Sequence, residues 1–566
     1  MSSPHLPTRP ATLLVIAAGL AACRASTEPD GTRVDCTGAP ITTLSAGGFA
    51  LIDPASTGGC LRLPAAGGSG AEHLVVALSA NGQETPGGVS GSYSLAGAME
   101  NTATAVSPSP LLRAFRHGQD GSAELQAGLR AREREIARGP GLAISLQGGR
   151  VVSAPPVVGD SRDFRVCGSV ACSDYVTVRA TARYVGANSA VFVDDTVPSG
   201  GFTSQDIGTI GDLFDQQLYP IDTMAFGRES DLDGNGVVIA LLTDQINRLS
   251  PNCDATGQAV SGYFLGTDLD LSDPNSNRGE VFYSRVPDPG HPLCFAKETV
   301  LRSLAPTFIH EFQHMISFNR HVLLPCAVQA RCGSAPEETW LNEGLSHFAE
   351  ELGGRQVAPS SCTGGNCLNQ FVAADIRNAA AYLADPEDAY LVEPAESEGT
   401  LAERGANWLF IRWLADGSPG DPVLGTDVTR RLLGAEQPGG ITVTGAATVM
   451  AAAQLFQPSA TLPELLGQWH AANYIERLPG FDDPSGRLSY ASWDLRSAID
   501  QLVPGPYPLR PDSTSGDGYS AHGTLRGGSG RYLRVVQPPA TGGVALSLTT
   551  GNGSQLTARL AVVRIR

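Results

Sequence analysis

The sequence lacks a surplus of positive charge. It has 39 lysine and arginine residues against 57 aspartate and glutamate residues, and its formal net charge is −18. Proteins that bind nucleic acid neutralise its phosphates with an excess of basic side chains. The charge balance therefore excludes nucleic acid from the expected partners.

Long hydrophobic runs are also missing. The apolar stretch at residues 11–20 has roughly ten residues, too few to span a bilayer but typical of the core of an export signal. No other stretch approaches about 18 consecutive apolar residues, so we expect the rest of the chain to lie outside the membrane. Hydrophobic residues nevertheless make up 42% of the 566 residues, which is enough for several buried cores.

The apolar stretch ends in Leu20-Ala-Ala-Cys23. This string resembles the lipobox of bacterial lipoproteins, in which the cysteine becomes the acylated first residue of the mature chain. Residues 1–22 are then a lipoprotein signal peptide and residues 23–35 a tether. We expect an exported protein, held by its lipid at the periplasmic or cell-surface face of a bacterial membrane. An ordinary signal peptide cleaved at the same point is the alternative.

The chain has 11 cysteines, and those other than Cys23 form an even set. They contain no C-x2-C pair, which disfavours a thiolate metal site. An even set in an exported protein is typical of disulfides. The spacing favours pairing between neighbours, although the sequence alone leaves other connectivities open. The neighbouring pairs are Cys36–Cys60, Cys167–Cys172, Cys253–Cys294, Cys326–Cys332 and Cys362–Cys367.

Residues 310–314 read His-Glu-Phe-Gln-His. On a helix, His310 and His314 are one turn apart and lie on one face, so both imidazoles can reach one metal ion. Glu311 lies about 100° further round the helix, beside the ion, where a general base for a metal-activated water belongs. The pattern predicts one catalytic zinc ion with Glu311 as the base.

A second helix is expected at about residues 335–352. Ser334 and Glu337 are predicted to form a capping box at its start, and Gly353-Gly354 is predicted to end it. Glu343 can present its carboxylate to an ion held by the first helix. The result would be a His2Glu site with water in the fourth position.

The strings HEFQHMI at residues 310–316 and TWLNEGLSHFAEEL at residues 339–352 resemble the gluzincin metallopeptidases. They are most similar to the hyicolysin-type secreted peptidases, as is the upstream region that contains FDQQLYP and DLDGNG. The resemblance covers about residues 160–420. It implies a thermolysin-like core that acts on protein or peptide substrates. It also implies that the two histidines and the later glutamate bind zinc, while the glutamate between the histidines activates water.

The expected fold class is α+β, with a thermolysin-like core, a helical subdomain and flanking all-β domains. Alternating apolar residues between turn signals predict strands near both ends of the chain, and stretches such as Leu401–Ala415 have helical periodicity. The expected domains are an N-terminal β-sandwich-like domain at 36–110, a helical linker at 111–159, a metallopeptidase core at 160–355, a mainly helical subdomain at 356–512 and a C-terminal β domain at 513–566.

Two supporting roles follow from the expected chemistry. Glu350 lies on the same helical face as Glu343 and is a candidate to orient a zinc-binding histidine. A further donor should stabilise the oxyanion that forms during hydrolysis. Related enzymes use a tyrosine or histidine from a later part of the chain, and the candidates here are Tyr390, His470 and Tyr474. Ordinary packing is the alternative interpretation of these residues.

Residues 97–101 spell Gly-Ala-Met-Glu-Asn, the exopeptidase signature of the aminopeptidase N-like gluzincins. In that family the signature lies on an edge strand shortly before the first zinc histidine, whereas here it lies in the N-terminal β region. Gly279–Ser284, at the expected distance from His310, alternates like an edge strand but lacks the signature. An extended substrate can pair with such a strand. Internal cleavage is therefore favoured over aminopeptidase action.

Residues 231–236 read Asp-Leu-Asp-Gly-Asn-Gly, the first half of a calcium loop, and predict calcium at Asp231, Asp233 and Asn235. The acid that such a loop needs at its twelfth position is missing, because Leu242 stands there. An acidic turn before a strand is the alternative interpretation.

Taken together, these patterns predict a zinc-dependent endopeptidase that hydrolyses protein or peptide substrates through a metal-activated water. An aminopeptidase is the first alternative. A surface adhesin or scaffold, whose β domains bind partners while proteolysis is incidental, is the second.

Overall fold

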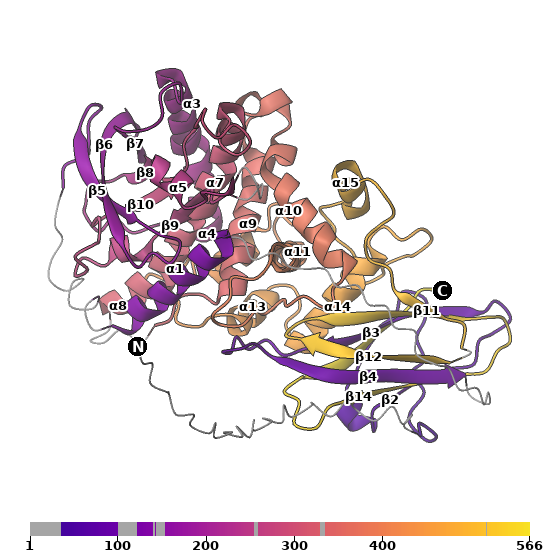
Figure 1. The fold of residues 1–566 in the computed structure, drawn as a ribbon. Coiled ribbons are helices and arrows are strands. Elements are labelled where there is room, and N and C mark those ends of the chain that lie inside the picture. Colours follow the sequence, from indigo (N-terminus) through magenta and orange to yellow (C-terminus); the bar gives the residue numbers. More distant parts are fainter. Residues whose placement is uncertain are drawn as a thin grey trace, which may run out of the picture.

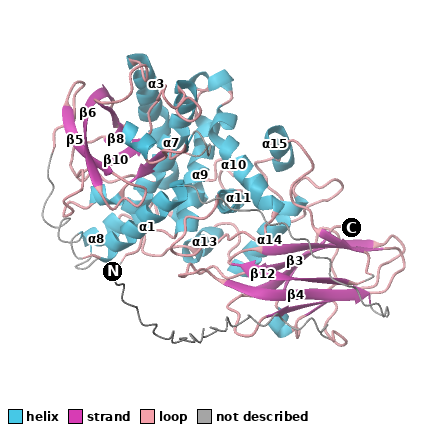
Figure 2. Ribbon diagram, viewed as in Figure 1, coloured by secondary structure: helices cyan, strands magenta, loops and turns pink. Residues whose placement is uncertain are grey.

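The computed structural model describes residues 35–99, 121–139, 142, 153–253, 259–328, 334–516 and 518–566. The predicted signal peptide, Cys23 and nearly all of the tether lie outside these ranges. Within the described part of the chain, no helix is long and apolar enough to cross a membrane. Helices lie between two groups of strands, which confirms the expected α+β class (Figures 1 and 2).

The first group of strands is a six-stranded sheet. Its order is β5 (Ser161–Cys167), β6 (Tyr175–Val185), β7 (Ser189–Asp194), β8 (Val238–Leu242), β10 (Val281–Ser284) and β9 (Gly262–Phe264). β10 runs parallel to β8 and antiparallel to β9, with Phe282 opposite Phe264. The prediction of an edge strand at Gly279–Ser284 is therefore wrong, because the short strand β9 pairs on its outer side.

Helices between these strands and after them in the chain fill the centre of the molecule. They are α3 (Ser204–Leu213), the π-helical turn η2 (Phe214–Leu218), α4 (Tyr219–Phe226), α5 (Asp244–Arg248), the 3-10 turn η3 (Gly266–Leu269), α7 (Lys297–Phe318), the π-helical turn η4 (Asn319–Leu323), α8 (Leu324–Val328), α9 (Thr339–Gln356), α10 (Cys367–Ala384), α11 (Leu401–Ala415), α12 (Thr426–Leu432), α13 (Ala446–Ala453), α14 (Leu462–Ile475) and α15 (Leu495–Leu502). α9 packs against α7, α10 and α11, and its residues 339–354 are all buried.

The end of α9 differs from the prediction. The helix continues through Gly353 and Gly354 because α10 approaches there: a Cβ on Gly354 would lie 3.0 Å from the Cα of Leu368. These glycines permit close packing and do not terminate the helix. The predicted capping box is also wrong, because Glu337 accepts a hydrogen bond from the backbone N–H of Gly445 (2.6 Å) and no side chain caps the helix start.

The second group of strands is one sandwich built from both ends of the chain. One sheet has the order β1 (Phe49–Ile52), β15 (Ala558–Arg564), β3 (Ala71–Ser79), β13 (Gly530–Gln537) and β11 (Asp512–Thr514), and the other has β12 (Tyr519–Arg526), β4 (Ser90–Met99), β14 (Val544–Thr550) and β2 (Cys60–Leu63). The predicted separation of an N-terminal from a C-terminal β domain is therefore wrong. The central strands β3 and β4 each pair on both sides with C-terminal strands, so neither half has complete sheets alone.

Helix α1 (Gly121–Arg138) falls within the predicted linker. Its side chains Leu125 and Leu129 are buried in the apolar core beside the six-stranded sheet, and the helix contacts η3. α1 is thus packed into the fold next to β9 and does not simply connect two domains.

Four of the five expected disulfides are present in the structure. They join Cys36 to Cys60, Cys167 to Cys172, Cys253 to Cys294 and Cys362 to Cys367. The fifth involves Cys332, which lies outside the described residues.

Candidate metal centre

Helix α7 positions the two histidines of the His-Glu-Phe-Gln-His motif. Its second half, from Phe308 to Phe318, is completely buried beneath the sheet and the neighbouring helices. His310 and His314 lie one turn apart, and their Nε2 atoms are 3.2 Å from each other. The rings meet edge to face with centroids 4.8 Å apart, so both can direct a nitrogen to one point.

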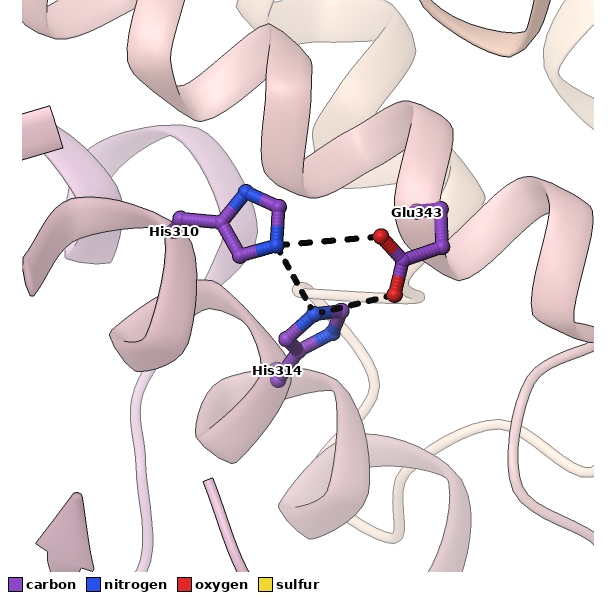
Figure 3. Close-up of side chains that lie close together, drawn as sticks. All are labelled: His310, His314 and Glu343. Atoms are coloured by element: carbon purple, nitrogen blue, oxygen red, sulfur yellow. Dashed lines mark hydrogen bonds and ion pairs between the residues drawn. The ribbon is translucent and has the colours of Figure 1, made fainter. Parts of the chain in front are cut away.

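Helix α9 supplies the carboxylate that faces them. One oxygen of Glu343 lies 3.8 Å from Nε2 of His310, and the other lies 3.4 Å from Nε2 of His314. Figure 3 shows the three side chains pointing toward one another from two helices. One candidate ligand atom from each residue lies within 4.8 Å of the others. The structure therefore brings together the three ligands that the sequence predicted.

The charge state of this cluster suits a metal ion. Burial lowers the pKa of His310 to about 4 and also lowers that of His314, so both imidazoles are neutral, the form that binds metals. Burial raises the pKa of Glu343, but the charge of Arg404 on α11 and the contacts with His314 and His310 together lower it well below its usual value. Both buried oxygens of Glu343 accept no hydrogen bond from the described residues. Two neutral nitrogens and one unsatisfied carboxylate fit a zinc ion with one open position.

Glu311 lies on the side of the cluster that faces the edge strand β9. A backbone hydrogen bond from Phe264 lowers its pKa, but burial and the nearby carboxylate of Glu343 raise it to about 8. One of its oxygens is buried without a hydrogen-bond partner among the described residues. A carboxylate with a pKa near neutrality, beside a metal site, is suited to proton transfer.

A second layer of side chains holds the histidines. Oε1 of Glu350 lies 2.8 Å from Nδ1 of His310, as expected from the sequence, and 3.0 Å from Nδ1 of His347. A carboxylate oxygen of Asp375 on α10 lies 2.9 Å from the same His347 nitrogen. His347 shares a helical face with Glu343 and could have been found from the sequence, whereas no motif connects α10 to the site.

The three oxyanion candidates lie elsewhere. His470 on α14 has Nδ1 2.8 Å from the hydroxyl of Tyr532 and Nε2 3.0 Å from the carbonyl of Gly528, so both ring nitrogens are engaged at the sandwich. Tyr390 packs near Gly88, and the charges of Arg534 and Glu72 act on Tyr474; both places are also at the sandwich. Among the described contacts, none of the three candidates reaches the metal cluster. His470 and Tyr474 belong to α14, which packs against the sandwich, and Tyr390 lies in the segment before α11. The described contacts do not support these assignments, which stay predictions.

The fold and the site thus define an α+β protein with a buried His2Glu metal centre. No family model matches the chain. The chain is similar to the neutral metalloprotease ShpI of Staphylococcus hyicus, with 31% identity over 174 residues, which is 31% of this chain and 36% of that protein. It therefore spans about a third of the length of this curated relative.

Similarity to solved structures is weak. Two structures of the M1 zinc metallopeptidase from Deinococcus radiodurans, one of them a mutant with a single alanine replacement, align with 14% sequence identity. The mutant alignment covers 58% of this chain and 55% of that one, with a TM-score of 0.29; the other covers 55% and 51%, with a TM-score of 0.28. Scores this low transfer neither a fold nor an activity.

Proposed function

We propose that the protein is a zinc-dependent endopeptidase that hydrolyses protein or peptide substrates. The observation that carries this proposal is the convergence of His310, His314 and Glu343 on one point, with Glu311 beside them. This donor set is that of catalytic zinc sites, in which three protein ligands leave one position open. The partial similarity to a protein named a neutral metalloprotease supports the same chemistry.

The residues of the chain divide the reaction between them. Zinc, when bound, would act as a Lewis acid that lowers the pKa of water and polarises the peptide carbonyl. Glu311 accepts the proton of the attacking water and delivers it to the leaving amine. Glu350 holds the ring of His310 through Nδ1, and the hydroxyl of Ser346 lies 3.1 Å from Nδ1 of His314. Such contacts keep the opposite nitrogens directed at the metal.

Internal cleavage is favoured by the position of the edge strand. β9 is an edge strand of the described sheet, with no strand paired on its outer side, and its Phe264 contacts Glu311 through the backbone. An extended substrate that pairs with β9 would pass the catalytic base at a peptide bond within its length. The exopeptidase-like string lies at the end of β4 in the sandwich, with its glutamate outside the described residues. An aminopeptidase and a scaffold with incidental proteolysis remain the alternatives.

We further propose that the protein is exported and lipid-anchored through Cys23. The lipobox-like string supports this anchor, and the four disulfides favour an oxidising compartment. The lipid would place the enzyme at the periplasmic or cell-surface face of a membrane.

Removal of the metal tests the proposed reaction. A chelator such as 1,10-phenanthroline is expected to reduce casein hydrolysis by at least about 100-fold, because without zinc the water and carbonyl lose their activation. Added zinc, at about one equivalent, should restore the rate. The measurement is the initial rate on casein and on reporter peptides with blocked amino termini. Cleavage of free-amino-terminal reporters alone would favour an aminopeptidase, and a zinc-loaded protein that cuts neither would favour a scaffold.

A further inference from the structure

The acidic loop before β8 meets a glutamate from a neighbouring strand. Asp231 and Asp233 lie in the loop, and Glu280 directly precedes β10. One carboxylate oxygen from each of the three lies within 4.8 Å of the others. The pairing of β8 with β10 holds Glu280 there, because its carbonyl accepts a hydrogen bond from Ile239 (2.8 Å). All three candidate ligand atoms of this cluster are carboxylate oxygens, and the cluster includes no histidine.

Glu280 carries an unsatisfied oxygen inside this cluster. Its side chain belongs to a residue that is 2% exposed. Oε1 accepts hydrogen bonds from the hydroxyl of Ser230 (2.6 Å) and the backbone of Leu232 (2.9 Å), whereas Oε2 is buried and has no partner among the described residues. A buried carboxylate oxygen without a partner is costly, so native proteins rarely leave one unless a ligand satisfies it.

Burial and the charge of Asp233 raise the pKa of Glu280 to about 7. Burial also raises the pKa of Asp233, even though the charge of Arg162 lowers it in part. A bound divalent cation would provide the missing positive charge.

We propose that Asp231, Asp233 and Glu280 bind a calcium ion. The calcium loop lacks an acid at its twelfth position, because Leu242 stands there and is buried in β8. Glu280, which directly precedes the neighbouring strand β10, supplies that carboxylate instead. Calcium prefers carboxylate and carbonyl oxygens and tolerates irregular geometry, whereas zinc favours sites with nitrogen or sulfur ligands. Asn235, the other residue predicted for this site, accepts a hydrogen bond from the backbone of Val237 (2.7 Å) through its side-chain oxygen and stays a prediction.

Calcium binding can be measured independently of catalysis. In the zinc-loaded chain, titration calorimetry should show one calcium site, and calcium should raise the melting temperature. Glu280→Gln is expected to weaken calcium binding by at least about 10-fold, because it removes one of three charged ligands. The matched control is Glu298→Gln, on the exposed side of α7, which should bind calcium as the wild type does.

Two results would overturn the site: no calcium-dependent change in the wild type, or equal calcium affinity in Glu280→Gln. Circular dichroism and zinc content establish that each variant is folded. If Glu280→Gln does not fold, Asp231→Asn provides the same comparison from the loop side. Calcium affinity equal to that of the wild type in this variant would also reject the proposal.

A second inference concerns access to the metal centre, and it rests on the proposed function. The exposed fractions of His310, Glu311, His314 and Glu343 are 9%, 3%, 0% and 1%. An endopeptidase must admit an extended polypeptide to these groups. In this structure the metal-binding residues and Glu311 are therefore covered by other parts of the chain.

Helix α1 lies beside η3, directly after β9, the strand with which an extended substrate is proposed to pair. Its Arg130 and Glu133 are 2% and 1% exposed and form an ion pair (2.9 Å). Nε of Arg130 is 4.0 Å from Glu398, and its charge acts on Glu343 and Glu311. Figure 1 shows α1 below the six-stranded sheet, where it contacts η3.

The contact between α1 and the strand end is tight. A Cβ added to Gly266, two residues beyond β9, would lie 2.8 Å from Cγ of Glu133. The helix thus occupies the space along the end of the edge strand, where a substrate backbone would pair.

We propose that α1 is an internal cover that keeps the peptidase latent. β3 and β4 precede α1 in the chain but lie in the middle of the two sandwich sheets. Removing everything up to α1 would therefore destroy the sandwich. Activation must displace or cut out α1 while residues 35–99 stay in place.

Two pairs of residues on α1 allow a matched test. Arg130→Ala with Glu133→Ala removes the buried pair, and Glu135→Ala with Arg138→Ala removes an exposed glutamate and an exposed arginine of the same spacing. The first double variant should raise the casein cleavage rate about 10-fold or more, because loss of Arg130 takes this cationic partner from the buried carboxylate of Glu398 (4.0 Å) and so weakens the docking of α1. It should accelerate zinc removal by a chelator by a similar factor, whereas the second should match the wild type.

Unchanged or slower zinc removal in the first double variant would reject the proposal that α1 covers the metal centre. That outcome is separate from failure of the proposed function, in which no variant cleaves casein although zinc removal still reports on α1. Should the alanine variant fail to fold by circular dichroism, Arg130→Met with Glu133→Gln keeps the volume of both side chains and gives the same readouts.

Discussion

Glu311→Gln is expected to reduce casein hydrolysis by about 10³-fold while zinc remains bound at about one ion per chain, because general acid–base groups contribute roughly 10²- to 10⁴-fold. Glutamine has nearly the same shape but cannot accept the proton of the attacking water. Glu311 is not one of the three residues whose atoms converge on the metal point, so its replacement should leave the ligands intact. The measurement is the initial rate together with the zinc content of the same preparation.

The control for this change is Glu298→Gln, the same substitution on an exposed turn of the same helix. It should retain the wild-type rate. A Glu311→Gln protein with more than about a tenth of the wild-type rate would show that another group is the general base. Loss of zinc together with activity would instead indicate that Glu311 contributes to metal binding.

His314→Ala is expected to abolish both zinc binding and hydrolysis. His314 is completely buried and lies between Glu343 (3.4 Å) and His310 (3.2 Å), so its loss leaves two ligands and a cavity. Zinc sites in proteins have four protein ligands when structural and three when catalytic. Because only two would remain, the zinc content should fall below about 0.1 ion per chain. Elemental analysis after dialysis measures this directly.

His522→Ala is the matched control, because His522 is exposed on β12 of the sandwich. It should bind zinc and hydrolyse casein as the wild type does. Retention of one zinc ion in His314→Ala would disprove the assignment of this histidine as a ligand. Circular dichroism is needed beside both variants, since a large-to-small change at a buried site also costs about 2–5 kcal/mol of stability.

Local sequence was sufficient for the residues that each helix offers to the metal centre, whereas the meeting of the two helices was implied by the resemblance to the gluzincins. His310 and His314 are related by one helical turn, and Glu343 lies on a face of α9 that the apolar residues leave free. Helical periodicity determines such relations within a few residues, so they can be derived without the rest of the fold. The same holds for strands such as β8, and for the disulfides between cysteines that are close in sequence.

The tertiary structure decided which distant segments meet. The union of the two terminal β regions into one sandwich, the placement of β9 outside β10, and the packing of α1 at the metal centre all join residues far apart in the chain. Glu280 reaches the acidic loop only through the pairing of β10 with β8. Local periodicity shows which face of an element is apolar but not which partner covers that face, because many partners bury similar area. The sequence by itself therefore determined the chemistry that two helices can offer, whereas long-range packing determined what surrounds that chemistry and what covers it.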